Sequence, residues 1–154
     1  MNKAAIRYFE EFKKANNLDE NIKANAFQFG EDADTLASLV IRGEKTATCS
    51  LHKAYEIENE PLPEINQYDV ILNTQDKPVA IIKNIDVFFA PMDEVSEEFA
   101  LSEGEGDKTY KYWWDAHIKF FTEYCKSLDI SFNTNDLLVC ERFECVDVNH
   151  TKEN

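Results

Sequence analysis

The order of helix-like and strand-like segments is the feature that most constrains the fold of this chain. Four segments have the apolar spacing or the composition of helices: 3–16, 32–42, 92–103 and 108–128. Four others have the composition of β-strands: 46–51, 68–73, 79–89 and 137–148. Because the two kinds do not alternate as regular βαβ units, the sequence predicts an α+β protein with a curved or closed sheet.

Short local signals set the limits of several segments. The Thr74–Pro78 turn joins the two central strands and predicts a β-hairpin. Asp32 or Asp34 is placed to cap the second helix, and Gly43 stands where a glycine commonly ends a helix. We therefore expect the chain to turn sharply at Gly43 before the next strand begins.

Composition favours one soluble domain. The chain has 154 residues, of which 44% are hydrophobic, and a chain of this size buries roughly 70% of its unfolded surface. No repeat or linker interrupts it, so we expect a single domain over 1–154 with a first helix at 3–16 and a short tail at 149–154. The start has no apolar signal core, and no apolar run approaches the roughly 18 residues of a membrane span. These features predict a cytoplasmic protein with no membrane partner.

Metal and cofactor motifs are not apparent in the sequence. The cysteines show no CxxC spacing and the histidines are scattered, whereas a zinc site needs closely spaced ligand pairs. We therefore expect buried, reduced thiols, no metal site and no cofactor. The residues concerned are Cys49, Cys125, Cys140, Cys145, His52, His117 and His150.

A lysine and three hydroxyl side chains follow the Gly43 turn. Thr46, Thr48 and Ser50 share one face of a regular strand, because side chains alternate. Lys45 meets Thr48 only if it lies in the turn and reaches back along its flexible side chain. A partly desolvated lysine can then serve as base for a hydroxyl nucleophile. The plainer interpretation is a helix end followed by a polar edge strand.

A second cluster places carboxylates around two glycines in the segment Ser102–Asp107. Glycine accepts the positive φ that a tight turn requires. In one interpretation Glu103 or Glu105 is a general acid–base or an orienting carboxylate. In the other, the segment is a helix end followed by Asp107 as the cap of the next helix, which leaves both glutamates without a role. A metal site built from these carboxylates lacks a companion histidine.

The segment 108–128 begins with a run of aromatic side chains. Their helical spacing favours core packing, although an aromatic ring at this place could also stack on a base. Tyr110 or Trp114 could project into a pocket while Trp113 packs inside. We expect His117 to be a hydrogen-bonded core residue.

An ion-rich pair of residues, Glu141 and Arg142, lies among apolar neighbours on the last strand. Arg142 either forms a structural ion pair with another element or binds a polar edge of a substrate. The residues alone leave both interpretations open.

The residues from Gly43 to Thr48 resemble the GxKxxT signature of ASCH domains, which belong to the PUA-like superfamily. Other segments are similar to the larger bacterial ASCH proteins, and they occur in the same order along roughly positions 26–148. They are Phe29-Gly30 with Asp34, Glu60–Pro63, Phe99–Asp107, Tyr112-Trp113 and Val139–Phe143. The resemblance implies a small PUA-like mixed β-barrel flanked by helices.

The resemblance also implies a function. Different ASCH members look like ribonucleases or like amidohydrolases that deacetylate N4-acetylcytidine. In the small amidohydrolase branch a lysine and a threonine of the signature act with a downstream glutamate, and Lys45, Thr48 and Glu103 stand at the equivalent places. By this resemblance Thr48 attacks the acetyl carbonyl, Lys45 is the base and Glu103 assists proton transfer. This chain is longer than that branch, and Ser50 stands where the small enzymes tend to have arginine, so the two can differ in substrate.

The leading hypothesis is therefore a hydrolase of an acylated nucleoside or a similar small amide. Lys45, Thr48 and Glu103 are its candidate catalytic residues. A lysine base needs a lowered pKa, so either Glu103 is protonated or the pair titrates as one coupled unit. The candidate substrate-binding residues are Ser50, Glu105, Tyr110, Trp114 and Arg142.

Two alternatives remain from the sequence: a non-catalytic nucleoside sensor, and a module that binds or cleaves short single-stranded RNA. The formal net charge is −14, from 16 Lys and Arg against 30 Asp and Glu. Since nucleic-acid affinity rests on neutralising phosphates, this charge favours a small, nearly neutral ligand over long RNA. An RNA module would need a local basic groove, for which the candidates are Lys45, Lys53, Lys108, Lys111 and Arg142.

Overall fold

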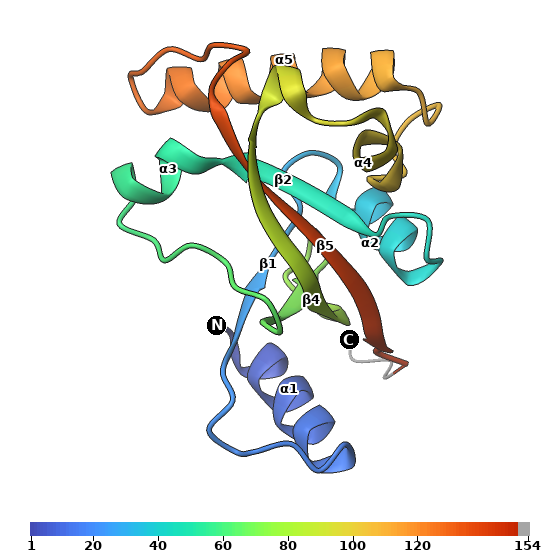
Figure 1. The fold of residues 1–154 in the computed structure, drawn as a ribbon. Coiled ribbons are helices and arrows are strands. Elements are labelled where there is room, and N and C mark those ends of the chain that lie inside the picture. The colour runs from blue at the N-terminus through green and yellow to red at the C-terminus, as the bar shows by residue number, and fades with distance from the viewer. Residues whose placement is uncertain (151–154) are drawn as a thin grey trace.

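A computed structural model describes residues 1–150 of the chain (Figure 1). Residues 151–154 of the expected C-terminal tail lie outside the described part. In the described part, no helix combines the length and the apolar character that crossing a membrane requires. The elements are, in chain order, α1 (Lys3–Ala15), β1 (Ala24–Phe27), α2 (Ala33–Ile41), β2 (Ala47–Leu51), α3 (His52–Ile57), β3 (Tyr68–Leu72), β4 (Pro78–Pro91), the 3₁₀ turn η1 (Met92–Glu94), α4 (Glu97–Ser102), α5 (Tyr110–Ser127) and β5 (Leu137–Val148).

The strands form one mixed sheet in the order β1-β3-β4-β5-β2. β1 runs parallel to β3, and every other pair of neighbours is antiparallel, including the expected β3–β4 hairpin. This architecture confirms the predicted α+β class with a mixed sheet and flanking helices. Within residues 1–150, β1 and β2 stand at opposite ends of the strand order without pairing, so the hydrogen-bonding pattern is that of an open sheet and does not close a barrel.

Helices cover both faces of the sheet, because successive strand residues point to opposite sides. Val70 packs with α1 through Phe9 and Phe12. Its neighbour Ile71 packs on the other face with Val40 of α2. A third cluster joins α4 and α5 to β2 and to the adjoining parts of β4 and β5. The helices α1, α2, α4 and α5 therefore cover the sheet through three hydrophobic clusters. The end strand β2 keeps one free edge.

Three elements differ from the sequence-based expectation. The segment 92–103, expected to be one helix, is divided into η1 and α4. The division occurs because Ser96 adopts an extended conformation and its side chain caps α4 by accepting from the Phe99 amide. β1 has only four residues, which is too short for a clear period-two pattern. α3 follows β2 directly and begins without a side-chain cap, so no start signal marks it.

The two ends of α2 are held by different means. Gly43 has φ +76° and ends the helix as predicted. Asp32 occupies the cap position but makes no capping hydrogen bond, because its own backbone is left-handed. Asp34 accepts hydrogen bonds from the Thr74 amide and hydroxyl at 2.9 and 2.8 Å. Asp34 therefore ties α2 to the β3–β4 turn and does not cap the helix.

Candidate functional site

A cavity of about 440 Å³ lies along the free edge of β2. It is lined on one side by Asn25 and Phe27 of β1, and on the other by residues 48–51 of β2. Phe120 and Tyr124 of α5 form part of its apolar wall. Its volume is within the range of small-molecule pockets. The cavity thus occupies the opening between the two end strands of the sheet, where a closed barrel would have paired them.

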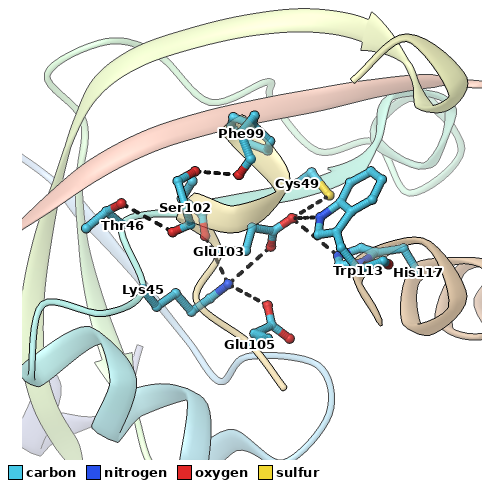
Figure 2. A network of polar contacts seen from close by, with 10 residues as sticks. Lys45, Thr46, Cys49, Phe99, Ser102, Glu103, Glu105, Trp113 and His117 are labelled. Atoms are coloured by element: carbon cyan, nitrogen blue, oxygen red, sulfur yellow. Dashed lines mark hydrogen bonds and ion pairs between the residues drawn. The ribbon is translucent and has the colours of Figure 1, made fainter. Parts of the chain in front are cut away.

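Lys45 lies buried at this cavity with all three of its protons engaged. The ammonium donates to the Ala47 carbonyl at 2.9 Å, to Glu103 Oε1 at 3.1 Å and to Glu105 Oε2 at 2.8 Å (Figure 2). The ring centroid of Phe29 lies 5.2 Å from Nζ. Only 1% of the Lys45 side chain is exposed, so its charge is balanced by the two carboxylates and not by water.

Two glycine turns bring these groups together. After the Gly43 turn, Lys45 lies two residues before β2 begins at Ala47, in the turn where the sequence-based hypothesis placed it. Gly104 has φ +69°, and a Cβ there would overlap the main-chain carbonyl of Glu44. The close approach of these two backbones holds the Glu103–Glu105 segment against the lysine turn.

The long helix beside this turn is also capped differently from the prediction. Thr109, not Asp107, is the cap of α5, and its hydroxyl accepts from the Tyr112 amide. Asp107 accepts from the Thr109 amide at 3.1 Å and from its hydroxyl at 2.6 Å. Asp107 therefore orients Thr109, and Thr109 caps the helix.

The second oxygen of Glu103 faces α5 and β2. Oε2 accepts from the Trp113 indole at 2.5 Å and from the Cys49 thiol at 3.3 Å, and it lies 3.4 Å from His117 Nε2 (Figure 2). Trp113 is buried, as expected. His117 is hydrogen-bonded through Nδ1 to the Trp113 carbonyl at 2.7 Å, and it also lines the cavity. Glu103 is therefore the central acceptor that joins Lys45 to the aromatic core.

The charges of this network reinforce one another. Burial alone would raise the pKa of Glu103, but Lys45, His117 and the hydrogen bonds outweigh it and hold this pKa well below the usual range. Burial would lower the pKa of Lys45, yet Glu103 and Glu105 raise it above its ordinary value. The lowered lysine pKa that the sequence-based hypothesis required is therefore not found: Glu103 is not protonated, and both partners of the pair are ionised because each stabilises the charge of the other.

Five of the predicted site residues meet at the cavity: Lys45, Thr48, Ser50, Glu103 and Glu105. The Ser50 hydroxyl is within 2.7 Å of the Tyr55 hydroxyl. Thr48 lines the cavity wall on the same face of β2 as Ser50. Within residues 1–150 the Thr48 hydroxyl has no hydrogen-bond partner, so it is available to a bound molecule.

The three other predicted residues lie elsewhere. Tyr110 and Trp114 stack on each other with ring centroids 6.2 Å apart, and together with Asp93 they line a separate surface hollow. Arg142 donates to both carboxylate oxygens of Glu98 at 2.9 and 2.8 Å. This contact corresponds to the structural ion pair of the sequence analysis. Among the described residues, none of these three side chains lines the cavity.

Cys49, Glu103 and His117 bring together three types of metal ligand, with ligand atoms within 4.8 Å of one another. Their spacing along the chain, without paired ligands, predicts no metal site. Two features of the cluster oppose a cation: the Lys45 ammonium binds the same carboxylate, and burial raises the pKa of the Cys49 thiol well above its usual value, whereas a metal needs the thiolate. The cluster is therefore a hydrogen-bonded network centred on the Glu103 carboxylate.

A family model for the ASCH domain matches residues 25–147. The chain belongs to the ASCH domain family. Similar solved structures include an ASCH domain from Lactobacillus crispatus, with 36% identity, a TM-score of 0.88 and coverage of 95% of this chain and 96% of that one. A protein of Enterococcus faecalis is 36% identical with a TM-score of 0.87, covering 100% of this chain and 99% of its own. No curated protein matches the chain. This ASCH domain has the PUA-like fold that the sequence motifs implied.

Proposed function

We propose that this ASCH domain hydrolyses the amide of an acylated nucleoside, of the N4-acetylcytidine type. The observation that carries the proposal is the buried Lys45–Glu103–Glu105 cluster beside a cavity that Thr48 also lines with an unengaged hydroxyl. A hydroxyl nucleophile and a proton-sharing cluster are the two parts that acyl transfer requires. The resemblance to the amidohydrolase branch at Lys45, Thr48 and Glu103 supports the assignment.

The ionised state of Lys45 sets how the proton moves. As an ammonium it cannot accept a proton, so the ion pair must first be neutralised by an uphill transfer of one proton to Glu103 Oε1 or Glu105 Oε2, and the neutral amine then takes the proton of Thr48. The Thr48 oxygen bonds to the acyl carbon, and the carbon–nitrogen bond breaks as Lys45 returns a proton to the departing amine. Water then cleaves the acyl ester, which releases the carboxylic acid and restores the threonine hydroxyl.

The charges on the surface favour a small ligand over RNA. Each of the five side chains that an RNA groove would use is paired with a carboxylate: Lys45 with Glu103 and Glu105, Lys53 with Asp136, Lys108 with Glu44, Lys111 with Asp115 and Arg142 with Glu98. Paired cations offer little to phosphates, whose neutralisation drives RNA binding. A neutral nucleoside carries no phosphate, so its binding does not depend on neutralising charge.

The test is a mass-spectrometric screen of modified nucleosides with the wild-type protein beside Thr48→Ala. We expect N4-acetylcytidine or a close analogue to be deacetylated, and Thr48→Ala to lose at least about 100-fold in kcat, as expected when a nucleophile is removed. Thr46→Ala is the matched control, because its hydroxyl is exposed, donates to the Ser102 carbonyl and lies outside the cavity.

Three results would change the assignment. Full activity in Thr48→Ala would exclude it as the nucleophile. Tight nucleoside binding without turnover by the wild-type protein would indicate a ligand sensor. A shift in the electrophoretic mobility of short RNA at low salt, without nucleoside binding, would favour the RNA-binding alternative.

A further inference from the structure

The cavity has a second polar wall, away from Lys45, made by two acidic side chains of the sheet. Asp69 of β3 is only 4% exposed, and both of its carboxylate oxygens accept from a single donor, the Gln67 amide, at 3.2 Å. Glu141 of β5 accepts from the Asn84 amide at 3.0 Å. Asp69, Gln67 and Glu141 all line the cavity. None of them is used by the proposed acyl-transfer step.

Acceptors outnumber donors at this wall. Two carboxylates hold four oxygen atoms, whereas the neighbouring amides of Gln67 and Asn84 supply one donor nitrogen each. Buried polar atoms are normally hydrogen-bonded. The wall therefore lacks hydrogen-bond donors, and a ligand can supply them.

The strand register places this wall next to the candidate nucleophile. Thr48 of β2 and Glu141 of β5 are direct cross-strand partners. Such partners lie on the same face of the sheet with Cβ atoms about 4.5–5.5 Å apart. Glu141 is therefore within reach of the nitrogen and ring of a ligand whose acyl carbon lies at the Thr48 hydroxyl.

Burial makes the charged state of this wall sensitive to its neighbours. It raises the pKa of Asp69 to about 7, and the nearby charge of Glu141 adds to the rise while the Gln67 hydrogen bond opposes it. Burial also raises the pKa of Glu141, against the hydrogen bond from Asn84. The pKa of the Tyr55 hydroxyl of α3 is also raised, chiefly by burial and further by the charges of Glu141 and Asp69. At pH 8, above its pKa of about 7, Asp69 is chiefly ionised and acts as an acceptor.

We propose that Asp69 and Glu141 form a specificity subsite that binds the amino-heterocycle part of the ligand and selects an exocyclic amino group over a carbonyl oxygen. The proposal rests on the function proposed above in one respect, namely that the amine is the leaving group of the hydrolysis. An amino group donates to carboxylate oxygens that the two amides satisfy only in part, whereas a carbonyl at the same place would face them with another acceptor and add no donor.

The test measures binding without turnover, by calorimetry at pH 8 with the Thr48→Ala protein and two neutral probes. Cytidine carries the amino group and uridine carries a carbonyl at the same ring position. We expect cytidine to bind at least tenfold more tightly. Glu141→Gln should abolish or invert this preference, because Asn84 orients the new amide with its oxygen inward and its amino group toward the ligand. Asp69→Asn should reduce the preference by removing a second acceptor.

The matched control is Glu144→Gln, an exposed residue of the same strand outside the cavity, which should keep the full cytidine preference. Thermal unfolding of each variant establishes that it is folded. Equal binding of the two nucleosides, no binding of either one, or an unchanged preference in folded Glu141→Gln would overturn the subsite. A cytidine preference without any deacetylation by the wild-type protein would refute the proposed hydrolase and leave the subsite standing.

Discussion

Replacing Glu103 by glutamine tests the electrostatic account of the site most directly. The substitution keeps the length of the side chain and removes one negative charge. One oxygen of Glu103 accepts a hydrogen bond from Lys45, and the other accepts from the Trp113 indole and the Cys49 thiol. A carboxamide has one oxygen and one amino group, so whichever way it turns, its amino group faces a donor.

The expected cost follows from the burial of the pair. Breaking a buried ion pair by removing one partner costs roughly 3–5 kcal/mol, since the remaining charge stays uncompensated. Glu105 still holds Lys45 at 2.8 Å, but its side chain is 20% exposed and is screened more by water. We therefore expect the free energy of unfolding to fall by about 3 kcal/mol. For a domain with a total stability of about 5–15 kcal/mol, this loss is large.

The assay is urea unfolding at pH 7, followed by circular dichroism. Glu44→Gln is the matched control: Glu44 also pairs with two basic side chains, Arg42 and Lys108, but on the surface. Exposed pairs contribute little, so this variant should unfold at nearly the wild-type midpoint. A Glu103→Gln loss below about 1 kcal/mol, or one no larger than that of Glu44→Gln, would refute the account of a buried, mutually dependent pair.

The pH dependence provides a second check with a definite sign. The pKa of Glu103 is lower in the folded protein than its ordinary value of 4.5. A group of this kind stabilises the fold above its unfolded pKa, and the contribution disappears as the pH falls through the folded pKa. The difference between wild type and Glu103→Gln should therefore not shrink from pH 7 to about pH 5; it should grow there as His117, whose pKa Glu103 raises, takes up its proton, and it should decrease only in stronger acid. A difference that shrinks between pH 7 and pH 5 would contradict the lowered pKa.

Three further predictions use other parts of the site. An NMR titration should give a pKa for His117 above 6.5, because the charge of Glu103 outweighs the effect of burial, and Glu103→Gln should lower it. Gly104→Ala should lower the free energy of unfolding in urea by about 2–3 kcal/mol, because the new Cβ combines a positive φ with a backbone clash. Gly43 has a positive φ but open space around it, so Gly43→Ala should lower the same free energy by only about 1 kcal/mol. Trp114→Ala should leave the calorimetric dissociation constant for cytidine unchanged, since its hollow is separate from the cavity, and weakened binding would contradict this placement.

Local signals explain how much of the site could be predicted from the sequence. Gly43 ends α2 and Gly104 permits the next close turn, so Lys45 and Glu103 could be identified as candidates near backbone that only glycine accommodates well. The β-hairpin and the last strand were also recognisable from their composition and turn residues. What the residues alone did not decide was that the two clusters face each other, and the family resemblance supplied that expectation.

The remaining parts depend on contacts between elements distant in the chain. His117 and Cys49 reach Glu103 from α5 and β2, and no spacing within one segment reveals such a meeting. Conversely, Tyr110 and Trp114 share a helical face with His117 but lie nearer the start of α5, where they line a separate hollow. The helical period shows which residues share a face, whereas tertiary packing sets how far along that face the cavity extends.

The open sheet and the candidate site depend on each other. Thr46 accepts from the Phe143 amide, so its carbonyl faces β5. Main-chain groups alternate along a strand, and the Ala47 carbonyl accordingly faces the free edge, where it accepts from Lys45. An unpaired strand edge ordinarily invites pairing with another chain. Here the lysine and the cavity wall occupy it. If β1 were long enough to pair with β2 and close the barrel, the edge would be satisfied by backbone, and both the lysine position and the cavity would be lost.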